Sequence, residues 1–167
     1  MKNYLKLNLN TANYVFGEVK KKTNDFLKSS GFSTQTIQSQ VAILKELIKN
    51  AIECANLRPS KDTMTVYVYF DDNSITVELK NPITDTASKK LEELDKTIQL
   101  MRGYQDPFEA YMLKIKEFSG NSHGDATNGL SLAKIAYEKN AIIDYFISED
   151  NILNMTATRY YEGDLRA

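Results

Sequence analysis

Apolar residues alternate with polar or tyrosine residues along three short stretches of the chain, which is the spacing of a strand with one buried face. These stretches are residues 4–9, 64–70 and 74–80. The turn residues Asp71-Asp72-Asn73 join the last two stretches, which therefore predict a β-hairpin. Residues 141–147 and 152–160 predict a second hairpin around Glu149-Asp150-Asn151. The strand at residues 4–9 is expected at an edge of the sheet.

Helical spacing of apolar residues dominates the rest of the chain. The longest helix is expected to begin at Ser33 or Thr34, to run to about Leu57 and to stop before Pro59. Its apolar stripe comprises Ile37, Val41, Leu44, Ile48, Ile52 and Ala55. Further helices are predicted at residues 14–28, 88–101, 107–118 and 129–139, the third of them with Asp106 as its N-cap and Pro107 at its first position.

Two hairpins and several one-sided helices predict an α+β fold. We expect a two-layer α/β sandwich with a mixed, mostly antiparallel sheet that helices cover on one face. At 167 residues the chain is most simply a single domain, residues 1–167. Its core is expected at residues 34–161, preceded by an N-terminal strand and helix in residues 1–33.

Composition and charge narrow the classes of function. The net charge is −1, which gives no general attraction to nucleic acid or to an anionic membrane. The sequence contains no apolar run that approaches the roughly 20 residues needed to span a bilayer, and its start lacks the apolar core of a secretory signal. The lone Cys54 excludes an intrachain disulfide and fits a reducing compartment. We therefore expect a cytoplasmic protein that binds neither nucleic acid nor membrane.

The longest predicted helix carries the first candidate chemistry. Glu46 and Asn50 are four residues apart, so their side chains lie on one helical face, apart from the apolar stripe. An asparagine that coordinates Mg²⁺ beside a glutamate that orients water is one chemistry that this pair can serve. A solvated polar pair on an amphipathic helix is the alternative interpretation.

A polar, glycine-containing segment at residues 119–129 is the second candidate. It leads directly into the predicted helix at 129–139. A glycine-rich loop before a helix N-terminus can hold phosphate, because the free backbone N–H groups and the helix dipole both favour anions. The alternative is an ordinary mobile loop on the surface.

The order of helix, hairpin and glycine-rich loop resembles the ATP-binding domain of the GHKL superfamily, which includes sensor histidine kinases, anti-sigma-factor serine kinases, gyrase, Hsp90 and MutL. The resemblance covers about Thr34 to Tyr161. Within it, Glu46-Leu47-Ile48-Lys49-Asn50-Ala51 looks like the N box of the superfamily, and Gly129-Leu130-Ser131-Leu132-Ala133 looks like its second glycine box. The layout is closest to the small stand-alone bacterial regulators of this group.

The resemblance implies the Bergerat, or histidine-kinase-like ATPase, fold and a site for ATP with Mg²⁺. It implies that Glu46 is the general base or positions water, that Asn50 is the Mg²⁺ ligand, and that Asn81 contacts adenine. Gly129 and Leu130 would donate backbone hydrogen bonds to phosphate. The remaining candidate contacts to the nucleotide are Asp85, Gly124 and Asn128.

Three departures from the family pattern affect the nucleotide site. The segment Asn81-Pro82-Ile83-Thr84-Asp85 stands where the family has Asp-x-Gly-x-Gly. A neutral carbonyl on Asn81 would bind adenine on the order of 1 kcal/mol more weakly than a carboxylate. Ser131 replaces a glycine and would be strained by roughly 1–2 kcal/mol in a left-handed conformation. The carboxylate of Glu53 would repel a triphosphate unless it faces solvent.

Two functions follow from these features. The first is a bacterial signalling regulator that binds ATP, with serine/threonine protein kinase activity in a partner-switching module as its candidate activity. Its partner would be a small regulatory protein such as an anti-sigma antagonist, a sigma factor or a receiver domain. The second is an interaction module that has kept the fold, lost ATP binding and sequesters a signalling partner. The edge strand at residues 4–9 could also pair two copies into a homodimer.

Overall fold

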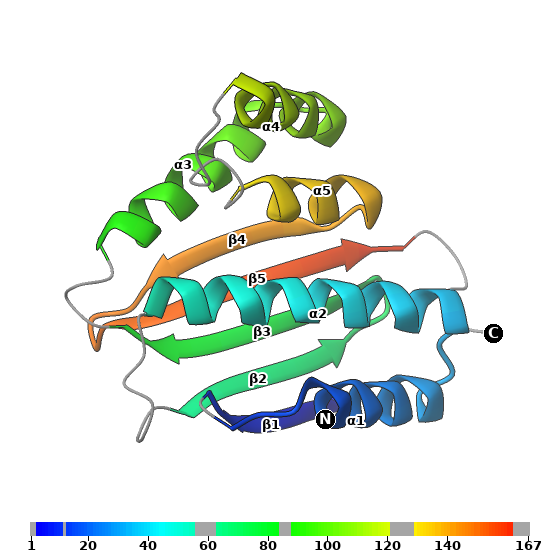
Figure 1. The fold of residues 1–167 in the computed structure, drawn as a ribbon. Coiled ribbons are helices and arrows are strands. Elements are labelled where there is room, and N and C mark those ends of the chain that lie inside the picture. Colours follow the sequence, from blue (N-terminus) through cyan, green and yellow to red (C-terminus); the bar gives the residue numbers. More distant parts are fainter. Residues whose placement is uncertain (1–2, 12, 56–62, 84–87, 121–128, 162–167) are drawn as a thin grey trace.

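The structure is a computed structural model, and it describes residues 3–11, 13–55, 63–83, 88–120 and 129–161. The described residues form a sheet of five strands and a layer of five helices (Figure 1). The strands are β1 (Tyr4–Asn10), β2 (Thr63–Phe70), β3 (Ser74–Pro82), β4 (Ile142–Ile147) and β5 (Ile152–Tyr160). The helices are α1 (Phe16–Ser29), α2 (Thr34–Ala55), α3 (Ser88–Gly103), α4 (Pro107–Gly120) and α5 (Leu130–Glu138).

The strand order is β1-β2-β3-β5-β4, with β1 at one edge, as predicted. Both predicted hairpins are present, with Val68 opposite Val77 in the first and Ile143 opposite Ala157 in the second. The sheet was expected to be mixed, but all four described pairings are antiparallel. The reason is the position of β5: the chain reaches the edge strand β4 first and then returns between β4 and β3, so β3 meets an oppositely directed neighbour.

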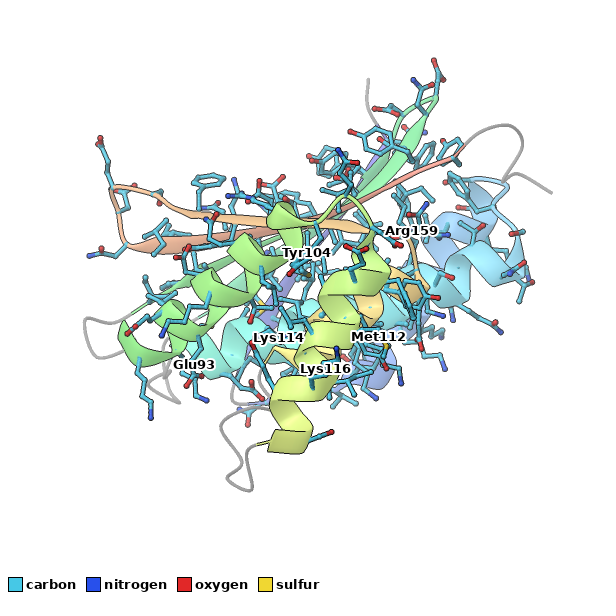
Figure 2. All side chains as sticks on the ribbon, turned by 90° about the horizontal axis from the view of Figure 1, so that it is seen from above. Glu93, Tyr104, Met112, Lys114, Lys116 and Arg159 are labelled. Carbon is cyan, nitrogen blue, oxygen red and sulfur yellow. The ribbon has the colours of Figure 1, made fainter. Side chains whose placement is uncertain are left out.

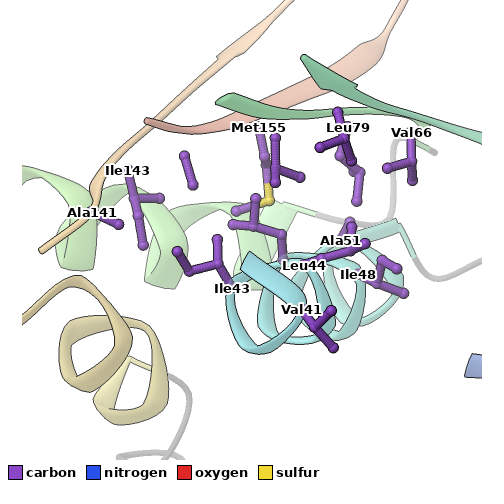
Figure 3. Close-up of a cluster of buried hydrophobic side chains, with 14 of the residues drawn as sticks. Val41, Ile43, Leu44, Ile48, Ala51, Val66, Leu79, Ala141, Ile143 and Met155 are labelled. Carbon is purple, nitrogen blue, oxygen red and sulfur yellow. The ribbon is translucent and has the colours of Figure 1, made fainter. Parts of the chain in front are cut away.

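The helices lie on one face of the sheet, which confirms the α+β two-layer sandwich (Figure 2). The long helix α2 crosses the middle of the sheet and buries Leu44, Ile48 and Ala51 against it (Figure 3). The side chains of the sheet that face α2 include Leu79 of β3 and Met155 of β5. In each of these strands every second side chain points to this face. Since burial of one large aliphatic side chain contributes about 1.5–3 kcal/mol, this contact stabilises the position of α2 strongly.

Local sequence signals explain where the helices begin. The Ser33 hydroxyl accepts a hydrogen bond from the backbone N–H of Thr36 at 3.2 Å, so Ser33 is the N-cap of α2. Asp106 accepts one from the N–H of Phe108 at 2.9 Å, with Pro107 as the first residue of α4. Both caps were predicted. The predicted end of the long helix, near Leu57, lies outside the described residues.

Polar and aromatic contacts fix the outer helices α3 and α4. The hydroxyl of Tyr145 in β4 donates to Asp95 of α3 at 2.7 Å, and Arg102 of α3 pairs with Asp144. The ring of Tyr137 on α5 lies 5.2 Å and 5.8 Å from two rings of α4, those of Phe108 and Tyr111. These contacts hold α3 against β4 and the first turns of α4 beside the end of α5. Among the described helices, none has the length and apolar character to cross a membrane.

Candidate functional site

Glu46 and Asn50 contact each other directly on α2. The Asn50 amide nitrogen donates to the Glu46 carboxylate Oε1 at 2.9 Å and to the Glu46 backbone carbonyl at 2.8 Å. Asn50 is only 6% exposed, whereas Glu46 is half-buried. Because both protons of the amide are engaged, the side chain is held in one orientation. The described residues supply no donor to Asn50 Oδ1 and no bond to Glu46 Oε2, so these two oxygens remain available.

Asn81 brings the end of β3 to the same part of α2. Its amide nitrogen donates to the backbone carbonyl of Ala51 at 3.0 Å, one residue after Asn50. Asn81 is 0% exposed, and no residue in the described part of the chain forms a hydrogen bond with its Oδ1. A buried acceptor without a partner costs about 1–3 kcal/mol, so this oxygen is a position where a ligand donor or a water molecule would stabilise the protein.

Gly129 lies where α3, α4 and α5 meet. It is buried and directly precedes the first residue of α5, Leu130. A Cβ added here would overlap Thr97 Oγ1 of α3 and would lie 2.9 Å from Lys114 Cε of α4. The φ of Gly129 is −105°, so the close approach of two helices, and not backbone conformation, requires the glycine. Ser131 lies inside α5 with right-handed backbone, so the strain expected for it does not arise.

Lys114 is a candidate residue that the sequence did not indicate. Its side chain is 13% exposed, and its ammonium would lie 3.0 Å from a Cβ on Gly129, at the N-terminus of α5. It forms an ion pair with the half-exposed Glu117 of the same helix, at 3.2 Å. The first turn of α5 carries no acidic residue. A cation and a helix N-terminus are both positive, so together they favour an anion between them.

The helix α3 connects the two ends of the candidate site. Near its start, the backbone carbonyl of Lys90 lies 3.8 Å from the Cys54 sulfur of α2. Two turns later, Thr97 contacts Gly129. The seven residues between these positions correspond to about 10 Å along the helix. Helix α3 therefore contacts both the last turn of α2 and the residue before α5, while the predicted contacts Asp85, Gly124 and Asn128 lie outside the described residues.

The polar groups fit magnesium and a nucleotide in part. Mg²⁺ is held in nucleotide sites by one or two protein oxygens together with phosphate oxygens and water, which Asn50 Oδ1 and Glu46 can provide. The described residues contain no group of three or more His, Cys, Asp or Glu side chains for a metal held by protein alone. Asn81 Oδ1 has the acceptor chemistry that an exocyclic amino group needs, but it is fully buried, so a ligand would reach it only after neighbouring residues move. Glu53 is exposed, which removes the repulsion that the sequence suggested.

The Cys54 thiol is a packing group and not a reactive one. It is 4% exposed, between α2 and α3. Burial, and secondarily the carboxylate of Glu53, raises its pKa from 9.0 to about 11. At neutral pH the thiol is therefore protonated, on the helix that carries Glu46 and Asn50.

Comparisons with known proteins bear on the fold. The chain is similar to one in the crystal structure of the SiaB–SiaC complex from Pseudomonas aeruginosa, with a TM-score of 0.64 and 15% sequence identity. The similarity covers 94% of this chain and 89% of that chain. No protein-family model matches the sequence, and no curated protein matches it. At this identity the likeness shows a shared fold.

Proposed function

We propose that this chain is a signalling regulator that binds ATP with Mg²⁺ between α2, the end of β3 and the N-terminus of α5. The observation that carries the proposal is the buried Oδ1 of Asn81, which has no hydrogen-bond partner among the described residues. The same side chain is bonded to Ala51, one residue after the ordered Glu46–Asn50 pair. An adenine amino group would supply the missing donor. The resemblance of residues 34–161 to the GHKL superfamily gives the same assignment.

Each polar group has a defined part in this proposal. Asn50 Oδ1 binds the metal, because Glu46 holds the amide nitrogen on its other side. Glu46 Oε2 accepts the proton of an attacking hydroxyl or water. The backbone N–H groups at the start of α5 and the Lys114 ammonium bind phosphate oxygens. When bound, the magnesium nucleotide supplies the phosphoryl group and neutralises charge, so the protein contributes mainly position and electrostatics.

The proposed partner is a small regulatory protein with a serine or threonine that accepts phosphate. Support comes from the fold, which the chain shares with one chain of a two-protein complex, SiaB–SiaC. In this proposal the chain acts as a serine/threonine kinase of a partner-switching module. An anti-sigma antagonist, a sigma factor or a receiver domain are the candidate classes of partner.

Calorimetric titration with Mg-ATP tests the nucleotide site. We expect the wild-type protein to bind and the Asn50→Ala variant to bind at least about tenfold more weakly, because the metal ligand is lost. Gln35→Ala is the matched control: it removes an exposed amide from the first turn of the same helix and should leave affinity unchanged. Equal affinities of wild type and Asn50→Ala would remove the metal role of Asn50.

A specific observation favours a second candidate, an interaction module without ATP. The strand β3 continues through Pro82, and the backbone N–H of Ile83 donates to the carbonyl of Asn151 at 2.9 Å. Regular backbone thus occupies the start of the segment where the superfamily has its first glycine box. If millimolar Mg-ATP gives neither heat nor a thermal shift while the protein still binds a regulatory partner, this second function holds.

A further inference from the structure

A groove of about 950 Å³ runs between α1 and α2, away from the candidate nucleotide site. The two helices lie side by side on the same face of the sheet (Figure 1). The α1 side of the groove is formed by every fourth residue from Phe16 to Lys28, a length of about 18 Å. That length corresponds to roughly three turns of a bound helix.

The floor of the groove is apolar. Phe32, Ile37 and Val41 line it from the α2 side and are each largely buried, and Phe16 lines it from α1. A nucleic acid would gain little from such a floor, since phosphate binding depends on dense positive charge. An apolar floor between two ridges suits the apolar face of an amphipathic helix.

The rim of the groove is basic although the chain as a whole carries a net charge of −1. Lys20, Lys28 and Lys45 line it against a single carboxylate, that of Asp25. All three lysines are exposed, and none forms an ion pair with any residue in the described part of the chain. Lys45 lies over the Phe16 ring, 5.7 Å from its centroid, which keeps its charge at the rim.

The N-terminus of α2 adds to this positive field. Thr34 belongs to the groove, and the first turn of α2 contains no acidic residue that would neutralise the helix dipole. A partner that crosses the groove would therefore meet positive charge along its rim and at one end.

We infer that the groove between α1 and α2 is a docking site for an acidic amphipathic helix of a partner protein. The apolar side chains of the partner helix would lie on the floor formed by Phe32, Ile37 and Val41. Its carboxylates would form ion pairs with Lys20, Lys28 and Lys45. The inference is independent of nucleotide binding, because the groove shares no residue with the proposed ATP site.

Two fluorescent peptides of about 18 residues test the inference. About 12 residues of helix span the groove, and the extra length makes helix formation in the peptide more favourable. Both carry leucine at helical spacing; one carries glutamate on the flanking positions and the other carries lysine. By fluorescence anisotropy, we expect the glutamate peptide to bind the wild-type protein, with an affinity that falls as salt is raised. The lysine peptide should not bind.

Charge reversal on α1 locates the binding. The pair Lys20→Glu and Lys28→Glu should weaken binding of the glutamate peptide about tenfold or more. The matched control, Lys21→Glu with Lys22→Glu, makes the same change of charge on the same helix outside the groove and should change affinity less than about twofold. Equal thermal unfolding of both variants excludes misfolding, since all four lysines are exposed.

Four outcomes would overturn the inference. The first is that the glutamate peptide does not bind at about 1 mM, and the second is that both double variants lose the same amount of affinity for it. The third is that a DNA duplex or phosphatidylserine vesicles bind more tightly than the peptide. The fourth is that the wild-type protein is a dimer and that the Lys20→Glu, Lys28→Glu variant is a monomer. The last result would show that a second copy of this chain occupies the groove. Unchanged Mg-ATP titration of the groove variant separates this test from that of the proposed function.

Discussion

Two asparagine amides, Asn50 and Asn81, define the candidate site at the scale of single residues. Each donates from its amide nitrogen to α2 backbone, at Glu46 and Ala51 respectively, and each keeps its oxygen for another group. An aspartate at position 81 has no proton to donate to Ala51 when ionised. Asparagine at this position therefore has a structural basis in this chain, since the amide both anchors β3 to α2 and retains an acceptor.

Replacing Asn81 by alanine should alter nucleotide selectivity. The wild type is expected to prefer ATP over GTP, because Asn81 Oδ1 accepts from the amino group of adenine and repels the carbonyl oxygen that guanine presents there. In Asn81→Ala the ratio of the two affinities should fall about tenfold. Competition titrations of both nucleotides measure this ratio, which a loss of stability alone would not change. An unaltered ratio would assign Asn81 to structure only.

At the scale of elements, the junction of α3, α4 and α5 depends on the absence of a side chain at Gly129. Thr97 and Lys114 occupy the space that a Cβ would need. The junction places the start of α5 beside α3 and brings the Lys114 ammonium to it. Packing between helices thus creates the positive end of the site.

Gly129→Ala should destabilise the protein by about 1–3 kcal/mol, because the new methyl group overlaps Thr97 and displaces α3 from α5. Urea unfolding measures the change. Gly103→Ala is the matched control: no atom lies within 4 Å of its added Cβ. At the end of α3 that substitution should be neutral or stabilising by about 0.5–1 kcal/mol. Equal effects of the two substitutions would refute the packing role of Gly129.

At the scale of the whole molecule, the buried thiol between α2 and α3 links stability to pH. Burial raises the pKa of Cys54 from 9.0 to about 11, so the unfolded chain releases this proton at lower pH than the folded protein. The stabilising contribution is therefore complete below about pH 9 and is lost as pH rises toward 11. Tyr145 acts in the same direction, since burial and its bond to Asp95 raise its pKa from 10.0 to about 12.

Urea unfolding should show a loss of about 1–2 kcal/mol from Cys54 between about pH 8 and pH 10. In Cys54→Ala the pH dependence over this interval should be smaller by that amount, although the variant is less stable at every pH because it leaves a small cavity. Identical slopes in the two proteins would show that the thiol does not titrate differently on folding.

The whole molecule also has two different long surfaces that are candidates for association. The strand β1 is an edge strand, as predicted, and pairing of two copies along it stays a prediction. The groove between α1 and α2 offers an apolar floor and a basic rim instead. Of the three consecutive lysines on α1, Lys20 lines this groove, whereas Lys21 and Lys22 are exposed outside it.

The sequence by itself determined the elements and the fold class, because their signals are local. Alternating apolar positions predicted both hairpins, Ser33 and Asp106 predicted two helix starts, and the four-residue spacing of Glu46 and Asn50 predicted their contact. Each of these signals acts within a few residues, through backbone geometry and side-chain hydrogen bonds.

Only the tertiary structure decided the antiparallel order of the sheet, the bond from Asn81 to Ala51, the position of Lys114 at the start of α5 and the groove between α1 and α2. These features join segments from about 15 to 80 residues apart in the chain. They result from how the helices pack on the sheet and on one another, and spacing within one segment carries no information about which distant side chain will fill or line the space beside it.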